Sequence, residues 1–338
     1  MPRVFRMALW GLVFIIPATL GFLRLPYYGI GPGPVRDVAP LIRFDGLERF
    51  DSGGRFVLTT VRWQQLTPLM AVRVWLDDTW RAVDREELFP PGLDRDEELA
   101  LSMAQMDQSQ IHAASVVLQE LVGYPDEHRP GALVEVAFPP CPAYGRLFPG
   151  EIVTAIDGEA VGSLDEADRL LEGAEAGEEL RFDVLSGEER RHVAIAPRRC
   201  VDGEDDAFFG VGLVATFPID VSIESADVGG PSGGLMFAIA LYDLLTPGDL
   251  TAGATIAGTG TLDLDGSVGA IGGIDDKIVA AQDADASLFL VPRENLKELR
   301  SVDTGDMRVV PVETFDEALD ALRQAGGDDE AETVPLTA

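Results

Sequence analysis

Ser232 lies between glycines in the stretch ADVGGPSGGLMFAIALYDLL, directly ahead of an apolar run that predicts a helix. A serine in that place is also a favoured helix N-cap, so this motif alone leaves its role open. A second stretch, AIGGIDDKIVAA, puts Lys277 in the first turn of another predicted helix, in a chain whose only other lysine is Lys297. A hydroxyl attacks efficiently when a neighbouring base removes its proton, and a lysine is such a base when its pKa is low. Ser232 and Lys277 are therefore a candidate nucleophile and general base.

The surroundings of Lys277 must lower the pKa of its amine for this chemistry. Burial in a closed site does so, and the positive end of a helix adds to the effect. Asp275 and Asp276 would raise that pKa if they faced the amine, so we expect both carboxylates to point to solvent.

The predicted helix after Ser232 also offers a place for the negative charge of a tetrahedral intermediate. Its first backbone N–H groups have no partner within the helix, which makes them natural donors to an oxyanion. Gly229 and Gly230 precede them, and we expect these glycines to keep the surrounding space clear.

These segments resemble the proteolytic domain of the Lon family, whose members are serine peptidases with a Ser–Lys dyad. The family's Pro-Ser-Ala-Gly motif appears as Pro-Ser-Gly-Gly around Ser232, with Gly233 in the place of alanine. The family's Thr-Gly pair matches Thr259 and the glycine after it, and its Pro-Ile-Gly-Gly-Leu stretch matches AIGGI ahead of Lys277. The resemblance spans residues 219–281. It implies that Ser232 and Lys277 form the dyad and that Thr259 holds them in register.

Residues 124–200 show a different pattern, with short strands and tight turns. The strand GALVEV is followed by PGEIVTAIDGEAV, by a short helix with a capping box at Ser163 and Glu166, and by a hairpin that turns at Ser186 and Gly187. This order resembles a bacterial PDZ domain, a module that binds an extended peptide as an added strand, usually beside a helix. The resemblance implies peptide tails as ligands of this module.

The expected fold class is α+β: a Lon-type proteolytic domain of mixed sheets and helices, interrupted by a PDZ module of the β-sandwich or barrel kind, after an N-terminal transmembrane helix. The stretch SMAQMDQSQIHAASVV, in a helix predicted from Asp94 to Gly123, resembles the helix that precedes the serine motif in Lon domains, which makes the module an insertion. The expected boundaries are an anchor at 1–25, a Gly- and Pro-rich linker at 26–49, a first Lon-like segment at 50–123, the PDZ module at 124–200, the proteolytic segment at 205–325 and a disordered acidic tail at 326–338.

A hydrophobic run at residues 7–23 is flanked by Arg3 and Arg6 on one side and by Tyr27 and Tyr28 on the other. This pattern is typical of a membrane anchor with its N-terminus inside, and a cleaved signal peptide is the alternative. Both interpretations put the rest of the chain outside the cytoplasm. The anchor interpretation makes it a single-pass protein of the cell membrane. A net charge of −32 argues against nucleic acid as a partner and against electrostatic docking on anionic lipid.

Cys141 and Cys200 fit one disulfide in an oxidising compartment, and two unpaired thiols are the alternative. His112, His128 and His192 are scattered and form no His-x-x-x-His motif, so we expect neither a zinc site nor a Ser–His–Asp triad, and no cofactor. We interpret His112 as an ordinary helix residue. The chain contains no Gly-x-x-x-x-Gly-Lys-Ser/Thr motif, so no P-loop motor of the usual form is expected.

These features predict an ATP-independent serine endopeptidase that faces outward and cleaves flexible segments of membrane or secreted proteins, since no motor unfolds its substrates. One alternative is a non-catalytic adaptor, in which the PDZ module gathers partners on a Lon-like scaffold. Retention of Ser232, Lys277 and Thr259 together argues against the adaptor. Another alternative is a protein that cleaves only itself. The family resemblance also implies a homo-oligomeric ring.

Overall fold

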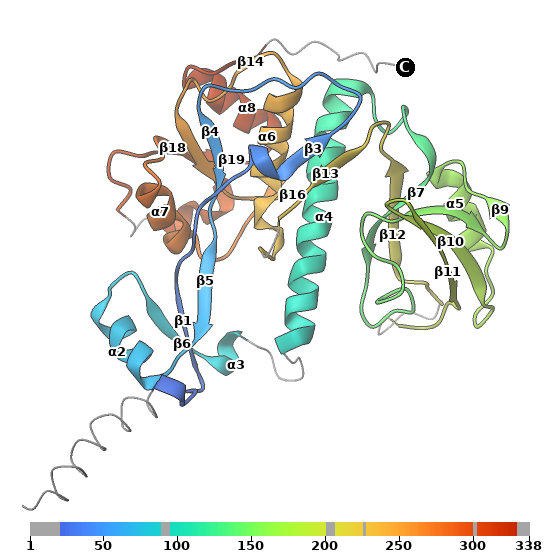
Figure 1. Ribbon diagram of the computed structural model, residues 1–338, viewed down its shortest axis with the longest axis horizontal. Helices are drawn as coiled ribbons and strands as arrows, with labels where there is room; N and C mark the ends of the chain where they lie inside the picture. Colours follow the sequence, from blue (N-terminus) through green and yellow to red (C-terminus); the bar gives the residue numbers. More distant parts are fainter. Residues whose placement is uncertain (1–20, 89–94, 201–206, 226–227, 300–302, 330–338) are drawn as a thin grey trace, which may run out of the picture.

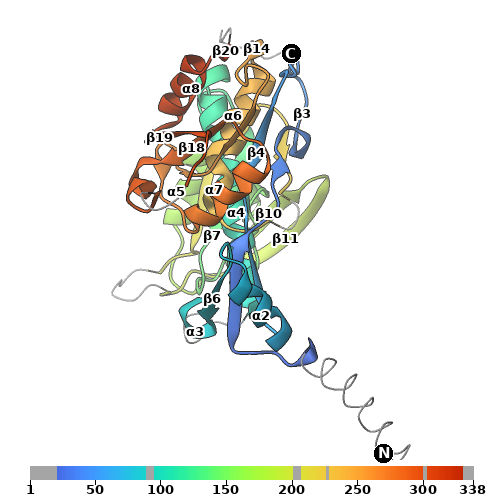
Figure 2. The same cartoon turned by 90° about the vertical axis from the view of Figure 1, so that its left-hand side faces the viewer.

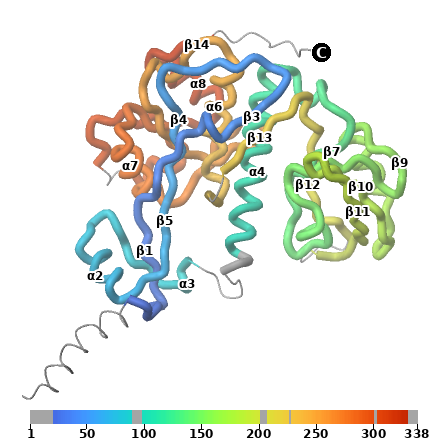
Figure 3. Tube along the Cα trace, viewed as in Figure 1, coloured from blue at the N-terminus to red at the C-terminus, as the bar shows by residue number. Residues whose placement is uncertain are grey.

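The computed structural model describes residues 21–88, 95–200, 207–225, 228–299 and 303–329. The expected anchor at residues 7–23 lies outside the described residues except for its last three. No helix within the described ranges combines the length and apolar character needed to cross a bilayer. Figures 1 and 3 show three parts, which we call the arm (residues 25–32 and 61–88), the β module (129–216) and the main unit, which contains the other described residues from Gly33 onward.

A five-stranded sheet in the order β19-β18-β15-β4-β2 organises the main unit. The first four strands in this order are parallel, and β2 is an antiparallel edge strand. The bounds are β2 Arg36–Asp37, β4 Arg55–Leu58, β15 Thr255–Gly258, β18 Leu288–Pro292 and β19 Arg308–Val312. The chain leaves this sheet after Leu58 and enters the arm.

Helices cover both faces of this sheet (Figure 2). Phe56 and Leu58 face the larger core, whereas Val57 between them faces the opposite layer, as alternation along a strand requires. The larger core contains α4, α6 and α8, and the opposite layer contains α7. The bounds are α4 Arg95–Val122, α6 Gly234–Leu245, α7 Ile274–Asp283 and α8 Phe315–Gln324.

One face of α8 is buried and includes Phe315, Ala318, Leu319 and Leu322, whereas α4 is buried on every side from Ile111 to Leu118. All 12 residues of α6 are buried, as expected for the apolar run after Ser232. A helix that is apolar on every side must lie inside a core, so α6 holds the segment before it in a fixed place.

The arm is an antiparallel sheet in the order β5-β1-β6, with two helices beside it. The bounds are β1 Tyr27–Pro32, β5 Val61–Gln65, α2 Pro68–Leu76, β6 Arg81–Asp84 and α3 Arg85–Leu88. The linker expected at 26–49 is therefore wrong, since β1 is a central strand, and β2, η1 (Ala39–Leu41) and β3 (Ile42–Phe44) follow it. Its glycines serve close packing: a Cβ at Gly31 would lie 2.5 Å from the ring of Trp80.

The β module is a sheet in the order β11-β10-β8-β7-β12 around its own apolar core. The bounds are β7 Arg129–Ala137, β8 Ile152–Ile156, β9 Glu159–Ala160, α5 Leu164–Glu172, β10 Leu180–Ser186, β11 Glu189–Ile195 and β12 Val211–Thr216. The boundaries expected at 200 and 205 are too early, because β12 pairs with β7 and completes this sheet. Arg129 is the register partner of Thr216, so the chain enters and leaves the module through adjacent residues.

Short strand pairs close the main unit. They are β13 (Val221–Ile223) with β3, β16 (Thr261–Leu262) with β17 (Val268–Gly269), and β14 (Gly248–Asp249) with β20 (Asp328–Asp329), and η3 spans Arg293–Lys297. The disordered tail expected from residue 326 is wrong at its start. Asp329 is ordered because its carboxylate accepts hydrogen bonds from the Tyr242 hydroxyl and the Arg323 guanidinium, each at 2.8 Å.

His112 is a residue of α4, as expected, and its side chain connects the main unit to the β module. From α4, its Nδ1 lies 2.8 Å from the carbonyl oxygen of Leu262, and its Nε2 lies 2.7 Å from the carboxylate of Glu135 in β7. The carbonyl oxygen of Leu262 and the ionised carboxylate of Glu135 can only accept, so both contacts are hydrogen bonds when the ring is protonated. Burial alone would lower the pKa of His112, but the bonds to Glu135 and Leu262 outweigh it and raise that pKa above its ordinary value.

Candidate active site

Ser232 lies in η2 (Pro231–Gly233), the turn that leads into α6. Gly233 occupies the N-cap position of α6, and no side chain caps that helix. The hydroxyl of Ser232 instead lies 2.6 Å from Nζ of Lys277. The helix-capping interpretation of this serine is therefore wrong, and its side chain is directed at the lysine.

Lys277 is in the first turn of α7 with its side chain inside the protein, only 3% exposed. Its amine is also 2.8 Å from Oγ1 of Thr259, so two hydroxyl groups hold it in place. Burial lowers the pKa of Lys277 to about 7. An amine with that pKa is largely neutral at slightly alkaline pH, and its free electron pair can then accept the proton of Ser232.

Thr259 follows β15 and is completely buried. Its hydroxyl donates to the backbone carbonyl of Ser232 at 3.0 Å and accepts from the amine of Lys277. The N–H of Gly260 donates to the same carbonyl at 2.9 Å. The end of a central strand therefore positions both the serine backbone and the lysine side chain, which is the place expected for Thr259.

The two aspartates before Lys277 differ from each other. Asp275 is exposed, as expected. The expectation for Asp276 is wrong: it is 3% exposed, and its Oδ2 lies 2.8 Å from Nη1 of Arg81 in β6. A buried carboxylate needs a partner, and the arm supplies one that the sequence pattern of α7 could not reveal.

Gly229 and Gly230 serve to seat the serine loop against α4 rather than to clear space for a substrate. A Cβ at Gly229 would lie 2.4 Å from Oγ of Ser102, and the N–H of Gly230 donates to the Ser102 carbonyl at 2.7 Å. Gly230 has a φ of 87°, which side chains rarely permit. The first N–H groups of the turn at Ser232 and Gly233 remain the natural oxyanion donors.

A pocket of about 670 Å³ opens over Ser232 and Lys277. The arm contributes Val61 and Trp63 from β5, a strand at the edge of its sheet. The main unit adds an apolar side with Leu99, Met106 and Ile271. The sequence does not reveal that the arm lines this pocket. β5 follows β4 after only two residues, and the apolar pattern does not show that the chain changes sheets there.

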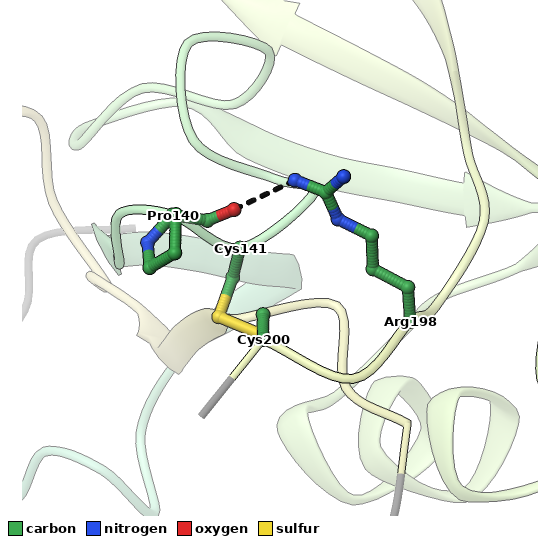
Figure 4. Close-up of a disulfide and its surroundings, with 4 residues drawn as sticks. All are labelled: Pro140, Cys141, Arg198 and Cys200. Carbon is green, nitrogen blue, oxygen red and sulfur yellow. Dashed lines mark hydrogen bonds between the residues drawn. A yellow bond between two sulfur atoms is a disulfide. The ribbon is translucent and has the colours of Figure 1, made fainter. Parts of the chain in front are cut away.

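Cys141 and Cys200 form a disulfide with an S–S distance of 2.05 Å (Figure 4). The bond lies next to Gly210, just before β12, and Arg198 donates to the carbonyl of Pro140 beside it at 2.8 Å. Because Cys141 follows the end of β7, the bond closes the end of the β module opposite the entry at Arg129.

The three histidines do not join Ser232. His112 contacts Leu262 and Glu135, His128 contacts Arg129, and His192 contacts Asp183. Among the described residues no group of histidine, cysteine, aspartate and glutamate side chains could hold a metal ion. The geometry at Ser232 is thus that of a serine hydrolase with a lysine base.

Comparison with known proteins gives the class of this segment. Residues 219–324 match the model of the Lon protease (S16) C-terminal proteolytic domain. The Lon protease of Xanthomonas oryzae pv. oryzae is 34% identical over 119 residues, which are 32% of this chain and 14% of that protein. The Lon protease of Campylobacter jejuni is 36% identical over 95 residues, 27% of this chain and 12% of that protein. These matches support a serine-type endopeptidase, and the matched segment contains Ser232, Thr259 and Lys277.

The resemblance to these relatives is confined to a part of each protein. A peroxisomal Lon protease homolog 2 of Danio rerio is 32% identical over 128 residues, 37% of this chain and 14% of that protein. The solved structures that are similar include the PDZ domain of an SdrC-like protein from Listeria innocua, which is 22% identical and covers 25% of this chain and 92% of that domain, with a TM-score of 0.23.

Proposed function

We propose that this chain is an ATP-independent, membrane-anchored serine endopeptidase that hydrolyses peptide bonds in extracytoplasmic or membrane proteins through Ser232 and Lys277. The observation that carries the proposal is the buried amine of Lys277, 2.6 Å from the Ser232 hydroxyl and 2.8 Å from that of Thr259. The anchor is the apolar run at residues 7–23, and the segment that matches Lon lacks a P-loop motif. Flexible segments are therefore the proposed substrates.

The proposed reaction starts with a neutral amine. Lys277 takes the proton of Ser232 as Oγ attacks the scissile carbonyl carbon, and the resulting oxyanion is held by N–H groups of the turn. The C–N bond then breaks as Lys277 gives its proton to the leaving amine, which leaves an ester on Ser232. A water molecule attacks that ester while Lys277 takes its proton, and the return of a proton to Oγ frees the acid product.

The β module is the proposed site for peptide tails, in the manner of a PDZ domain. β12 ends the order of its sheet, so among the described strands its outer edge has no partner. A pocket of about 730 Å³ lies there, lined by Leu171 of α5 and by Phe208 and Val211 at the start of β12. An extended peptide can add to such an edge beside a helix and place an apolar side chain in the pocket.

The test is hydrolysis of unfolded casein by the full chain in detergent without ATP, compared with Ser232→Ala and Lys277→Ala. The full chain is needed because β1 begins at Tyr27 and a shorter fragment would break the arm. Lys297→Ala is the matched control, since it removes the only other lysine from an exposed position. Activity that both dyad variants lose and the control keeps supports the endopeptidase, whereas an inactive folded parent supports the adaptor.

Cleavage of an added substrate also separates this function from self-cleavage. For the module, Phe208→Ala is expected to reduce binding of peptide tails and cleavage of a protein that carries one, while hydrolysis of a short peptide is unchanged. Equal loss on both substrates would contradict a recognition role for the module.

A further inference from the structure

The α2 helix of the arm exposes an apolar stripe. Leu69 is 66% exposed, Val72 54%, Trp75 81% and Leu76 71%. Their spacing places these four side chains on one side of the helix, and Val74 is its only buried residue. Large apolar side chains exposed singly are ordinary, but four on one short helix mark a surface that another medium or molecule covers.

The first described residues are also apolar and exposed. Phe22 is 86% exposed and Leu23 57%, and both end the apolar run at residues 7–23. The N–H of Leu25 donates to the carbonyl of Leu66 at 2.9 Å, and Nε2 of Gln65 donates to the carbonyl of Leu25 at 3.0 Å. These bonds tie the end of the run to the residues just before α2. Figures 1 and 2 show both at the end of the arm farthest from α6 and α8.

We propose that α2 lies in the membrane–water interface beside the anchor, with Leu69, Val72, Trp75 and Leu76 in contact with lipid. This inference rests on the proposed membrane anchoring. Tryptophan and leucine on one side of a helix are typical of interfacial helices, and tryptophan favours the headgroup level. The net charge of −32 opposes attraction to anionic lipid, so apolar contact must supply the binding. Continuity with residues 7–23 favours lipid as the occupant over a second copy of the chain.

The geometry of the arm then limits which substrates reach Ser232. β5, a strand of 5 residues, connects the pocket at Val61 and Trp63 to the start of α2. An extended strand of that length spans about 17 Å. With α2 held at the interface, β5 therefore keeps this side of the pocket close to the lipid surface. The substrate class we infer is therefore a flexible segment close to the membrane, such as the residues that flank a transmembrane helix.

The experiment is fluorescence quenching of the full chain in phosphatidylcholine vesicles, with lipids brominated near the headgroup end of the acyl chain. The signal of Trp75 is obtained as the difference between the parent and Trp75→Phe, because the chain contains 4 tryptophans. We expect strong quenching by the brominated lipid and weak quenching by iodide in the water. In Leu69→Ser/Val72→Ser/Leu76→Ser we expect Trp75 to be quenched strongly by iodide and weakly by the brominated lipid. Leu296→Ser, which removes an exposed leucine of the main unit, should leave the quenching of Trp75 unchanged.

Two results would overturn the inference. Quenching of Trp75 by iodide but not by the lipid would mean that the stripe faces water. Shielding from both quenchers, together with cross-linked dimers through α2, would assign the surface to a second copy. Flotation of the chain with vesicles and casein hydrolysis that depends on Ser232 are measured in parallel, so a failure of α2 is distinguished from a failure of the anchor or of the enzyme.

Discussion

Nη1 of Arg81 lies 2.8 Å from Oδ2 of Asp276, and this ion pair joins β6 of the arm to the helix that carries Lys277. The carboxylate is 3% exposed, whereas the guanidinium side chain is 49% exposed. Burial raises the pKa of Asp276, and Arg81 opposes that effect. The arm therefore neutralises the negative charge next to the proposed base, and burial is the cause that lowers the pKa of Lys277.

Arg81→Gln is expected to shift the pH dependence of peptide hydrolysis. Without the guanidinium, burial raises the pKa of Asp276 further. While that carboxylate is ionised, its uncompensated charge raises the pKa of the Lys277 amine, so the acidic limb of kcat/KM moves to higher pH. Arg36 and Arg62, the arginines that line the pocket over Ser232, are unchanged in this variant. The measurement is the pH profile on a short peptide.

The second variant in this series is Arg81→Gln/Asp276→Asn. It removes both charges and should return the acidic limb of the kcat/KM profile to its position in the parent. A uniform loss of activity at every pH in Arg81→Gln would show that the ion pair acts only on structure.

Lys277 itself predicts the pH range of activity. Its amine must be neutral to accept a proton, and its pKa is about 7, so kcat/KM should rise as the pH increases through about 7. Lys277→Arg keeps a positive charge at every working pH and should lose roughly 10²–10⁴-fold in kcat. An acidic limb near the pKa of a free lysine would contradict the buried neutral base.

His112 predicts a pH-dependent link between the main unit and the β module. Its pKa is raised in the folded protein, so its contribution to stability is complete below the unfolded pKa of about 6.5 and is lost as pH rises through the higher folded pKa. His112→Gln should lower the free energy of unfolding by about 1–3 kcal/mol at acidic pH.

Thermal unfolding of the full chain between acidic and alkaline pH measures this effect. The difference in Tm between the parent and His112→Gln should narrow as the pH rises, and His128→Gln is the histidine control. A difference that stays constant with pH would mean that the ring is neutral and only fills space.

Gly229 predicts a steric coupling between the serine loop and α4. A Cβ there would lie 2.4 Å from Oγ of Ser102, so Gly229→Ala should displace Ser232 and cost about 1–3 kcal/mol of stability. Ser102→Ala removes the oxygen that clashes, and the double variant Gly229→Ala/Ser102→Ala should recover part of both activity and Tm. Strictly additive losses in the double variant would refute this coupling.

Local chemistry determined much of what the sequence predicted. The apolar run after Ser232 had to become a buried helix, and the spacing in α8 had to produce one buried face, because these patterns depend on residues within a few turns. Local signals marked Ser232 and Lys277 as candidates, and the resemblance to the Lon family added Thr259. A capping box also placed the capping serine of α5, whose Oγ accepts from the N–H of Glu166 at 3.3 Å.

Tertiary structure alone decided the rest, because the missing contacts join residues far apart in sequence. In the sequence, the glycines near Gly31 look like a linker, but in the structure the ring of Trp80 packs against Gly31. Asp276 likewise looks like a solvent-facing carboxylate, but in the structure it pairs with Arg81 of the arm. Nothing in α4 shows that His112 will meet Glu135 and Leu262. Burial lowers the pKa of the Lys277 amine, which lies where α7 contacts η2 and the end of β15. Desolvation depends on the whole packed core and not on any one segment, so the sequence near Lys277 could not determine it.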